Sequence, residues 1–226
     1  MLQLREEEIF KTLKNIKKFN FVIIGGYAVN AYTLPRFSVD CDIVITEKNK
    51  AFHKSLKEQG YKVTEADKIN TPYKGEFMRY EKKIQKGFKV STDILIREVL
   101  DRQTNTTFTA DWISENSSVK TLKGKTITEK LKLNIINIDA LIVMKSISCR
   151  NTDIRDVFML MPKAKDKEWI KKEISSRHNF ENRMSIIKKK VLSKKFKDNL
   201  QGVYGYIEPT VFEKHKKAIL YLGKSD

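Results

Sequence analysis

Residues 21–45 read FVIIGGYAVNAYTLPRFSVDCDIVI, and this stretch decides the fold. The apolar run at its start is typical of a short buried strand, and Gly25-Gly26 marks a tight turn at the end of that strand. A short helix over residues 27–34 is expected next, because the proline that follows disfavours helical backbone. Residues 40–45 return to an apolar strand pattern. The stretch therefore predicts a strand–turn–helix–strand unit.

The second of these strands carries two carboxylates, Asp40 and Asp42, separated by Cys41. Side chains alternate along a strand, so both carboxylates point to one face, roughly 7 Å apart. Two negative charges on one face of an apolar strand repel each other, and burying them unpaired is costly. A divalent cation removes both problems, and Mg²⁺ prefers oxygen ligands together with substrate phosphates. The pair therefore predicts a site for Mg²⁺ or Mn²⁺.

A third carboxylate, Asp93, lies within residues 88–96, which form another apolar strand pattern. Three carboxylates on rigid backbone can hold two metal ions. One ion would lower the pKa of an attacking hydroxyl, and the other would hold a triphosphate and stabilise the pyrophosphate that leaves. Asp40, Asp42 and Asp93 are therefore the candidate catalytic and metal-binding residues.

Gly25 and Gly26 are candidate nucleotide-binding residues, because glycine lets the backbone approach a ligand closely. They also precede a helix, whose first N–H groups and positive dipole end favour phosphate. Ser38, just before the acidic pair, could donate one more hydrogen bond. Each motif alone is more often structural, since a glycine pair is usually a turn and a lone acidic pair usually belongs to a surface strand or a cap. Their order within one unit favours the functional interpretation.

The rest of the chain predicts an α+β fold, with a mixed sheet and flanking helices followed by a helical C-terminal part. The expected elements are helices at 5–18 and 49–59, strands at 61–65, 77–82 and 88–96 with a turn near 85–87 between the last two, and a hairpin of 118–122 with 125–128. After Asn137, a plausible N-cap, the pattern is helical to the C-terminus. We expect a catalytic domain at residues 1–128 and a helical, basic domain at 129–226.

The ordered motifs resemble the signature of the DNA polymerase β-type nucleotidyltransferase superfamily, which is hG[GS], a spacer, Dh[DE]h and a later hDh. The corresponding residues here are 24–26, 40–43 and 92–94. The resemblance implies a nucleotidyltransferase fold and an enzyme that moves a nucleotide from an NTP such as ATP to an acceptor hydroxyl. The sequence RFSV at 36–39 also resembles the R-x-[ST]-x-D-x-D form of many small members, which adds Arg36 to the nucleotide-binding candidates.

A second block is similar to one branch of this superfamily, the AbiEii-type nucleotidyltransferases, which are toxins of toxin–antitoxin and abortive-infection systems. Residues 139–145, DALIVMK, and 155–158, RDVF, resemble the E-x-L-x-x-x-K and R-D-[LI]-[YF] motifs of that branch. The resemblance implies nucleotide-binding roles for Lys145 and Asp156, and a cognate antitoxin as a partner. From the residues alone, Lys145 either snorkels to solvent or reaches a phosphate, and Asp156 either acts in the site or belongs to a structural ion-pair cluster.

The chain carries 45 Lys and Arg against 28 Asp and Glu, a formal net charge of +17. Such a charge attracts polyanions, so an RNA acceptor, with tRNA as one example, is a natural partner. A lysine-rich solvated surface is the alternative explanation of the same charge. No apolar run approaches membrane-spanning length, and the two cysteines form no metal-binding motif. We expect a cytoplasmic protein with no membrane partner.

Three functions remain open on these grounds. The first is nucleotidyl transfer to RNA, as the toxin of a toxin–antitoxin system. The second is the same chemistry on a protein or on a small molecule such as an aminoglycoside, although a cationic drug prefers an acidic cleft and the net charge is +17. The third is non-catalytic nucleic-acid binding on this fold, which a missing catalytic carboxylate would favour. All three carboxylates are present in the sequence.

Overall fold

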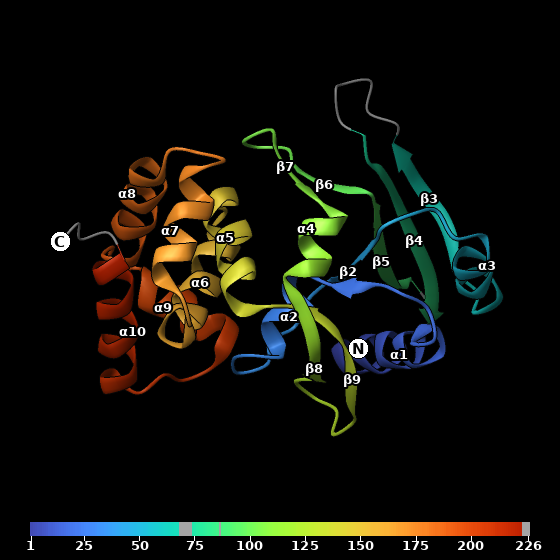
Figure 1. The fold of residues 1–226 in the computed structure, drawn as a ribbon. Helices are drawn as coiled ribbons and strands as arrows, with labels where there is room; N and C mark the ends of the chain where they lie inside the picture. The colour runs from blue at the N-terminus through green and yellow to red at the C-terminus, as the bar shows by residue number, and fades with distance from the viewer. Residues whose placement is uncertain (68–73, 86, 223–226) are drawn as a thin grey trace. The chain divides into compact units, whose positions relative to one another are not determined.

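The computed structural model describes residues 1–67, 74–85 and 87–222. The chain forms two compact units (Figure 1). The first unit consists of Met1–Ala31, Pro35–Leu100 and Thr107–Ile136, and the second of Tyr32–Leu34, Asp101–Thr106 and Asn137–Asp226. The domain boundary expected after residue 128 stays a prediction.

The first unit is built on a mixed sheet, with seven strands in the part of the chain that the structure describes. Their order is β3-β4-β5-β2-β1-β9-β8. β2 is parallel to β5 and β1 is parallel to β9, whereas the other neighbours are antiparallel. The strands are β1 (Val22–Ile23), β2 (Asp40–Ile45), β3 (Lys62–Asp67), β4 (Glu76–Gln85), β5 (Phe88–Ile96), β8 (Ser117–Lys123) and β9 (Lys130–Ile136).

Besides this sheet, the N-terminal part of the chain forms helices and a small two-stranded hairpin. They are α1 (Leu2–Ile16), α2 (Gly25–Asn30), α3 (Lys50–Glu58), the hairpin of β6 (Glu98–Asp101) with β7 (Thr106–Thr109), and α4 (Ala110–Glu115). α1 buries Ile9, Leu13 and Ile16 at helical spacing and packs against α3 and β5. This apolar face of α1 is part of the core of the first unit.

The strand expected at residues 125–128 is wrong, because β8 pairs with β9 instead. The backbone N–H groups of Lys125 and Thr126 both donate to the carboxylate of Glu6 on α1, at 2.7 Å. Glu6 is buried, so these N–H groups are satisfied by a side chain rather than by a neighbouring strand. The connection after β8 is therefore held by the N-terminal helix.

The second unit contains the helices of the C-terminal part, namely α5 (Ile138–Ser148), α6 (Asn151–Leu160), the 3₁₀ turn η1 (Met161–Lys163), α7 (Lys167–Ser175), α8 (Phe180–Val191), α9 (Phe196–Tyr204) and α10 (Pro209–Leu222). Phe158 is fully buried in this unit, and its ring centroid lies 5.1 Å from those of Phe196 and Phe212. None of the helices in the described ranges has both the length and the apolar character needed to cross a membrane. The predicted fold class, α+β with a mixed sheet and a helical C-terminal part, is confirmed.

Candidate active site

Two neighbouring strands bring the predicted carboxylates together. β2 and β5 are parallel, with Asp42 opposite Asp93 and Asp40 opposite Ser91. Paired residues on adjacent strands point to the same face, so all three carboxylates lie on one face of the sheet. Cys41 points to the other face and is fully buried. Burial, and then the nearby carboxylates, raise the pKa of the Cys41 thiol, which makes it a neutral core residue.

Arg79 on β4 extends this row, because it lies opposite Asp93 in the β4–β5 register. Its Nε and Nη2 atoms donate to the two carboxylate oxygens of Asp93, each at 2.8 Å. Nη2 also lies 3.6 Å from Oδ2 of Asp40. The hydrogen bonds to Asp93 raise the pKa of Arg79, so the guanidinium among the carboxylates stays positively charged.

Besides Arg79, a second polar residue outside the predicted site, Ser91, contacts one of the carboxylates. Its hydroxyl donates a hydrogen bond to Oδ1 of Asp40. Arg79 and Ser91 contact carboxylates on neighbouring strands, so no spacing within one motif indicates these contacts. A signal for Arg79 was nevertheless present, because an antiparallel pair with Gln85 opposite Phe88 sets Arg79 opposite Asp93. Residue 86, within the turn expected at 85–87, lies outside the described residues.

Gly25 lies directly against the carboxylate of Asp42. It has a φ of +63°, and a Cβ atom built there would overlap the side chain of Asp42. The N–H of Ile24 donates to the backbone carbonyl of Asp42 at 3.1 Å, which holds the two segments together. α2 begins at Gly25 and ends at Asn30, earlier at both ends than the helix expected at 27–34. Glycine is therefore required at residue 25 for both conformation and space.

Gly26 lies beside the other nucleotide-binding candidates. A Cβ atom there would overlap the hydroxyl of Ser38 and lie 3.1 Å from Nη2 of Arg36. The Arg36 backbone is anchored by Asn30, which donates to the Arg36 carbonyl at 2.9 Å and accepts from its N–H at 3.0 Å. The hydroxyl of Ser38 donates to the carbonyl of Asp40 at 3.1 Å. The structure thus brings four of the six nucleotide-binding candidates, Gly25 among them, to the carboxylate-bearing strand.

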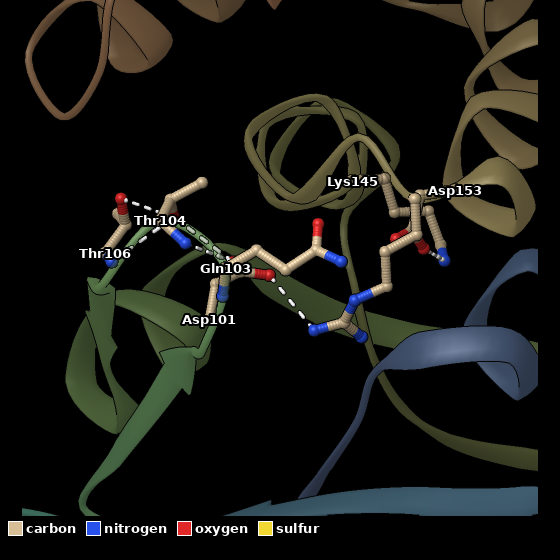
Figure 2. Close-up of polar contacts among 7 residues, drawn as sticks. Asp101, Gln103, Thr104, Thr106, Lys145 and Asp153 are labelled. Atoms are coloured by element: carbon tan, nitrogen blue, oxygen red, sulfur yellow. Dashed lines mark hydrogen bonds and ion pairs between the residues drawn. The ribbon is translucent and has the colours of Figure 1, made fainter.

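The other two candidates, Lys145 and Asp156, lie in the second unit and contact each other. The ammonium of Lys145 is 2.8 Å from Oδ2 of Asp156 and 2.9 Å from Oδ1 of Asp153 (Figure 2 shows the contact with Asp153). The hydroxyl of Tyr204 donates to Oδ1 of Asp156 at 2.6 Å. Lys145 is only 7% exposed, so its ammonium does not snorkel to solvent. It is held between two buried carboxylates.

Asp101, at the end of β6, is a further buried carboxylate of the second unit, and it has several donors (Figure 2). It accepts from the N–H groups of Gln103 and Thr104, at 2.9 and 3.0 Å, and from Nη2 of Arg150 at 3.3 Å. Burial alone would raise the pKa of Asp101, but the hydrogen bonds it accepts and the charge of Arg150 lower that pKa below its ordinary value. These contacts fix the turn between β6 and β7.

The three carboxylates on the sheet have the chemistry that Mg²⁺ or Mn²⁺ requires, because both ions favour oxygen ligands. Within the described ranges, however, no three His, Cys, Asp or Glu side chains are grouped closely enough to hold a metal ion as they stand. Both oxygens of Asp93 are bonded to Arg79, and one oxygen of Asp40 is bonded to Ser91. The residue types fit such a cation, and at Asp93 it would compete with Arg79 for the carboxylate oxygens.

Comparisons with protein-family models and with curated protein sequences give no match to the chain. Solved structures, by contrast, are similar to it. A structure described as a "putative nucleotidyltransferase from H. pylori" has a TM-score of 0.52 and 15% identity, covering 97% of this chain and 90% of its own. JHP933 from Helicobacter pylori has a TM-score of 0.50 and 16% identity, covering 98% of this chain and 91% of its own.

At 15–16% identity these similarities establish the fold. The chain has the mixed-sheet α+β architecture of the structure described as a "putative nucleotidyltransferase", with the helical C-terminal part included in the match. The expected nucleotidyltransferase-type fold is therefore confirmed, and membership of the superfamily stays a prediction. The closer resemblance to AbiEii-type enzymes, and the roles of the individual site residues, stay predictions.

Proposed function

We propose that the protein is a Mg²⁺-dependent nucleotidyltransferase, which moves a nucleoside monophosphate from an NTP to an acceptor hydroxyl. The observation that carries this proposal is the row of carboxylates. Asp40, Asp42 and Asp93 share one face of two paired strands, and the backbone of Gly25 lies against Asp42. Similarity in fold to a structure described as a nucleotidyltransferase supports the same class of enzyme.

In this reaction the acceptor oxygen forms a bond to the α-phosphorus, the bond between that phosphorus and the bridging oxygen of the β-phosphate breaks, and pyrophosphate leaves. Mg²⁺ held by Asp40, Asp42 and Asp93 would neutralise phosphate charge and lower the pKa of the acceptor hydroxyl. The carboxylates lie on hydrogen-bonded strands rather than on loops. The backbone therefore fixes their spacing before any ligand binds.

The nucleotide phosphates are proposed to bind beside Gly25 and Gly26, where the absence of side chains leaves the backbone open to close approach. Ser38 and Arg36 lie next to Gly26 and supply a hydroxyl and a positive charge. The resemblance of residues 139–158 to AbiEii-type enzymes extends this proposal to Lys145 and Asp156, which form one ion pair. A direct phosphate contact by Lys145 would compete with the carboxylates that already hold it.

RNA is the proposed acceptor, with tRNA as one example. The net charge of +17 supports a polyanionic acceptor, and residues 163–226 alone contain 17 Lys and Arg against 8 Asp and Glu. The AbiEii-like block further suggests that the protein acts as a toxin whose activity a cognate antitoxin restrains. The RNA acceptor is thus proposed from the charge of the chain, and the toxin role from the resemblance.

The deciding experiment supplies each α-labelled NTP with Mg²⁺, total cellular RNA and the purified protein, and follows the label. We expect label on RNA with one or more NTPs, and no label with Asp42→Asn. Asp198→Asn is the matched control, because Asp198 is an exposed aspartate in α9. Label on the protein fraction, or on an added aminoglycoside, would reassign the acceptor. Absence of label under every condition would instead favour a non-catalytic nucleic-acid-binding protein on this fold.

A further inference from the structure

Arg79 lies in a row of charged side chains that crosses four strands. Glu65 on β3 is opposite Arg79, Arg79 on β4 is opposite Asp93, and Asp93 on β5 is opposite Asp42 on β2. All four therefore point to the same face of the sheet. Arg79 has carboxylates on both sides, and the charges of Asp93, Asp40 and Glu65 all favour its positive form.

On one side, Arg79 makes a two-pronged ion pair that occupies both oxygens of Asp93. The Asp93 side chain is only 10% exposed, and a negative charge buried to that extent is costly unless a positive group lies beside it. Arg79 is that partner in this structure, and its own side chain is 31% exposed. The guanidinium therefore has room to move, whereas the carboxylate does not.

A divalent cation at Asp93 would compete with the guanidinium for the same two oxygens. Mg²⁺ binds carboxylate oxygens at about 2.0–2.1 Å, and two positive groups on the same two oxygens would repel each other. A displaced Arg79 would be stabilised by pairing with a second carboxylate, and the charge of Glu65 already favours its positive form. Glu65, its neighbour in register on β3, is on the side away from Asp93.

We propose that Arg79 is an exchangeable internal cation, which holds Asp93 when the divalent cation is absent and moves to Glu65 when that cation binds. This inference rests on the proposed metal-dependent function and adds two positioning residues to it. Arg79 keeps the buried acid paired between reaction cycles, and Glu65 sets how easily Arg79 leaves. Neither residue is assigned a contact with the substrate.

The test is a double-mutant cycle read by calorimetric titration of the nucleotide-free protein with Mn²⁺ alone. Arg79→Gln should tighten Mn²⁺ binding by about tenfold, because the competing charge is gone. Glu65→Gln should weaken Mn²⁺ binding by roughly threefold, because displaced Arg79 loses its second partner. In the double variant Glu65→Gln should have little further effect, since Arg79 is no longer present to be displaced.

Two exposed residues of the first unit serve as charge-matched controls, Lys123→Gln for Arg79 and Glu115→Gln for Glu65. Each should leave Mn²⁺ affinity within about twofold of wild type, because exposed charges at a distance are screened. Arg79→Lys is added in case Arg79→Gln leaves Asp93 too poorly compensated to fold. Glu65→Gln does not touch Asp93, so it tests the exchange even if both Arg79 variants unfold.

The outcomes separate the two proposals. Equal Mn²⁺ affinity in wild type, Arg79→Gln and Glu65→Gln would overturn the exchange while leaving a metal-dependent enzyme in place. Mn²⁺ binding that is undetectable in every variant, wild type included, would overturn both. A Glu65→Gln effect of the same size in the presence and absence of Arg79 would show that Glu65 acts directly on the cation, which also contradicts the exchange.

Discussion

The backbone of Gly25 occupies the space beside the Asp42 carboxylate that a Cβ atom would need. Gly25→Ala should therefore destabilise the first unit by about 1–3 kcal/mol, from positive φ and overlap together. It should also reduce nucleotidyl transfer, because Asp42 must shift. Urea unfolding and labelled-NTP transfer measure the two effects.

Gly202→Ala is the control, since nothing lies within 4 Å of a Cβ at this helical position, and it should be neutral or stabilising. Equal stability of both variants would contradict this account of Gly25.

Asp40→Asn and Asp42→Asn should each abolish transfer by several orders of magnitude. Asn has nearly the shape of Asp, so the hydrogen bond from Ser91 to residue 40 can persist, but the charge that holds the cation is lost. Removing one of several clustered carboxylates also relieves repulsion, so thermal stability should be unchanged or slightly higher. Transfer rates at saturating NTP and melting curves check both statements. A near-normal rate in either variant at ordinary Mg²⁺ would remove the central assignment.

Lys145→Ala should destabilise the second unit by about 3–5 kcal/mol, because it leaves Asp153 and Asp156 buried without their common cation. Nucleotide affinity must therefore be measured under conditions in which the variant is still folded. Tyr204→Phe removes one hydrogen bond to Asp156 and should cost about 1–3 kcal/mol. Tyr206→Phe, at a residue that is 70% exposed, should cost almost nothing. If Lys145→Ala unfolds at the wild-type urea midpoint, the buried ion pair has no structural role.

Asp101 should contribute to acid sensitivity. Its pKa in the folded protein lies below the ordinary value of 3.8. A group whose folded pKa is depressed stabilises the protein above its unfolded pKa, and this stabilisation is lost as pH falls through the folded pKa. Asp101→Asn should therefore lower stability at neutral pH and flatten the loss of stability below about pH 4. Unfolding free energies at pH 7 and along an acid series test this, with exposed Asp198→Asn as control. An unchanged acid slope would contradict it.

RNA binding should weaken steeply with salt, because neutralising phosphates releases counterions. Replacing exposed Lys194 and Lys195 by Gln should weaken binding to single-stranded RNA. The slope of log affinity against log salt should fall by about 0.7 for each phosphate that the variant no longer neutralises. Replacing Lys11 and Lys17, exposed residues of the first unit, provides a charge-matched comparison. Filter binding from low to moderate ionic strength gives both slopes. Salt-independent binding would favour a protein or small-molecule acceptor.

Two site-bearing strands could be located from the sequence to the residue. The strands expected at 40–45 and 88–96 are β2 and β5 as observed, because each ends in consecutive apolar residues of high strand propensity. The shared face of Asp40 and Asp42 follows from strand alternation alone. The same reasoning placed Gly25 at the end of a strand, where α2 begins.

Other features depend on interactions between distant residues, so local patterns could not predict them. β6, β7 and α4 were not expected, and Thr-rich residues 104–109 carry no apolar alternation. The sequence of residues 125–128 is typical of a strand. The contacts of its backbone with the Glu6 carboxylate, far away in the sequence, cannot be predicted from that pattern. The buried pairing of Lys145 with Asp153 and Asp156 likewise becomes visible only when α5 and α6 are placed together.

The charged row across the sheet has a consequence for folding as well as for chemistry. If β4 slipped by one residue along β5, Arg79 would turn to the face where Tyr80 is now fully buried. A guanidinium would then be forced into an apolar core, and Asp93 would be left without its cation. Misregistered sheets are thus penalised by the same charges that form the candidate site. Selection for function at this site therefore also selects a chain whose strands align in one way.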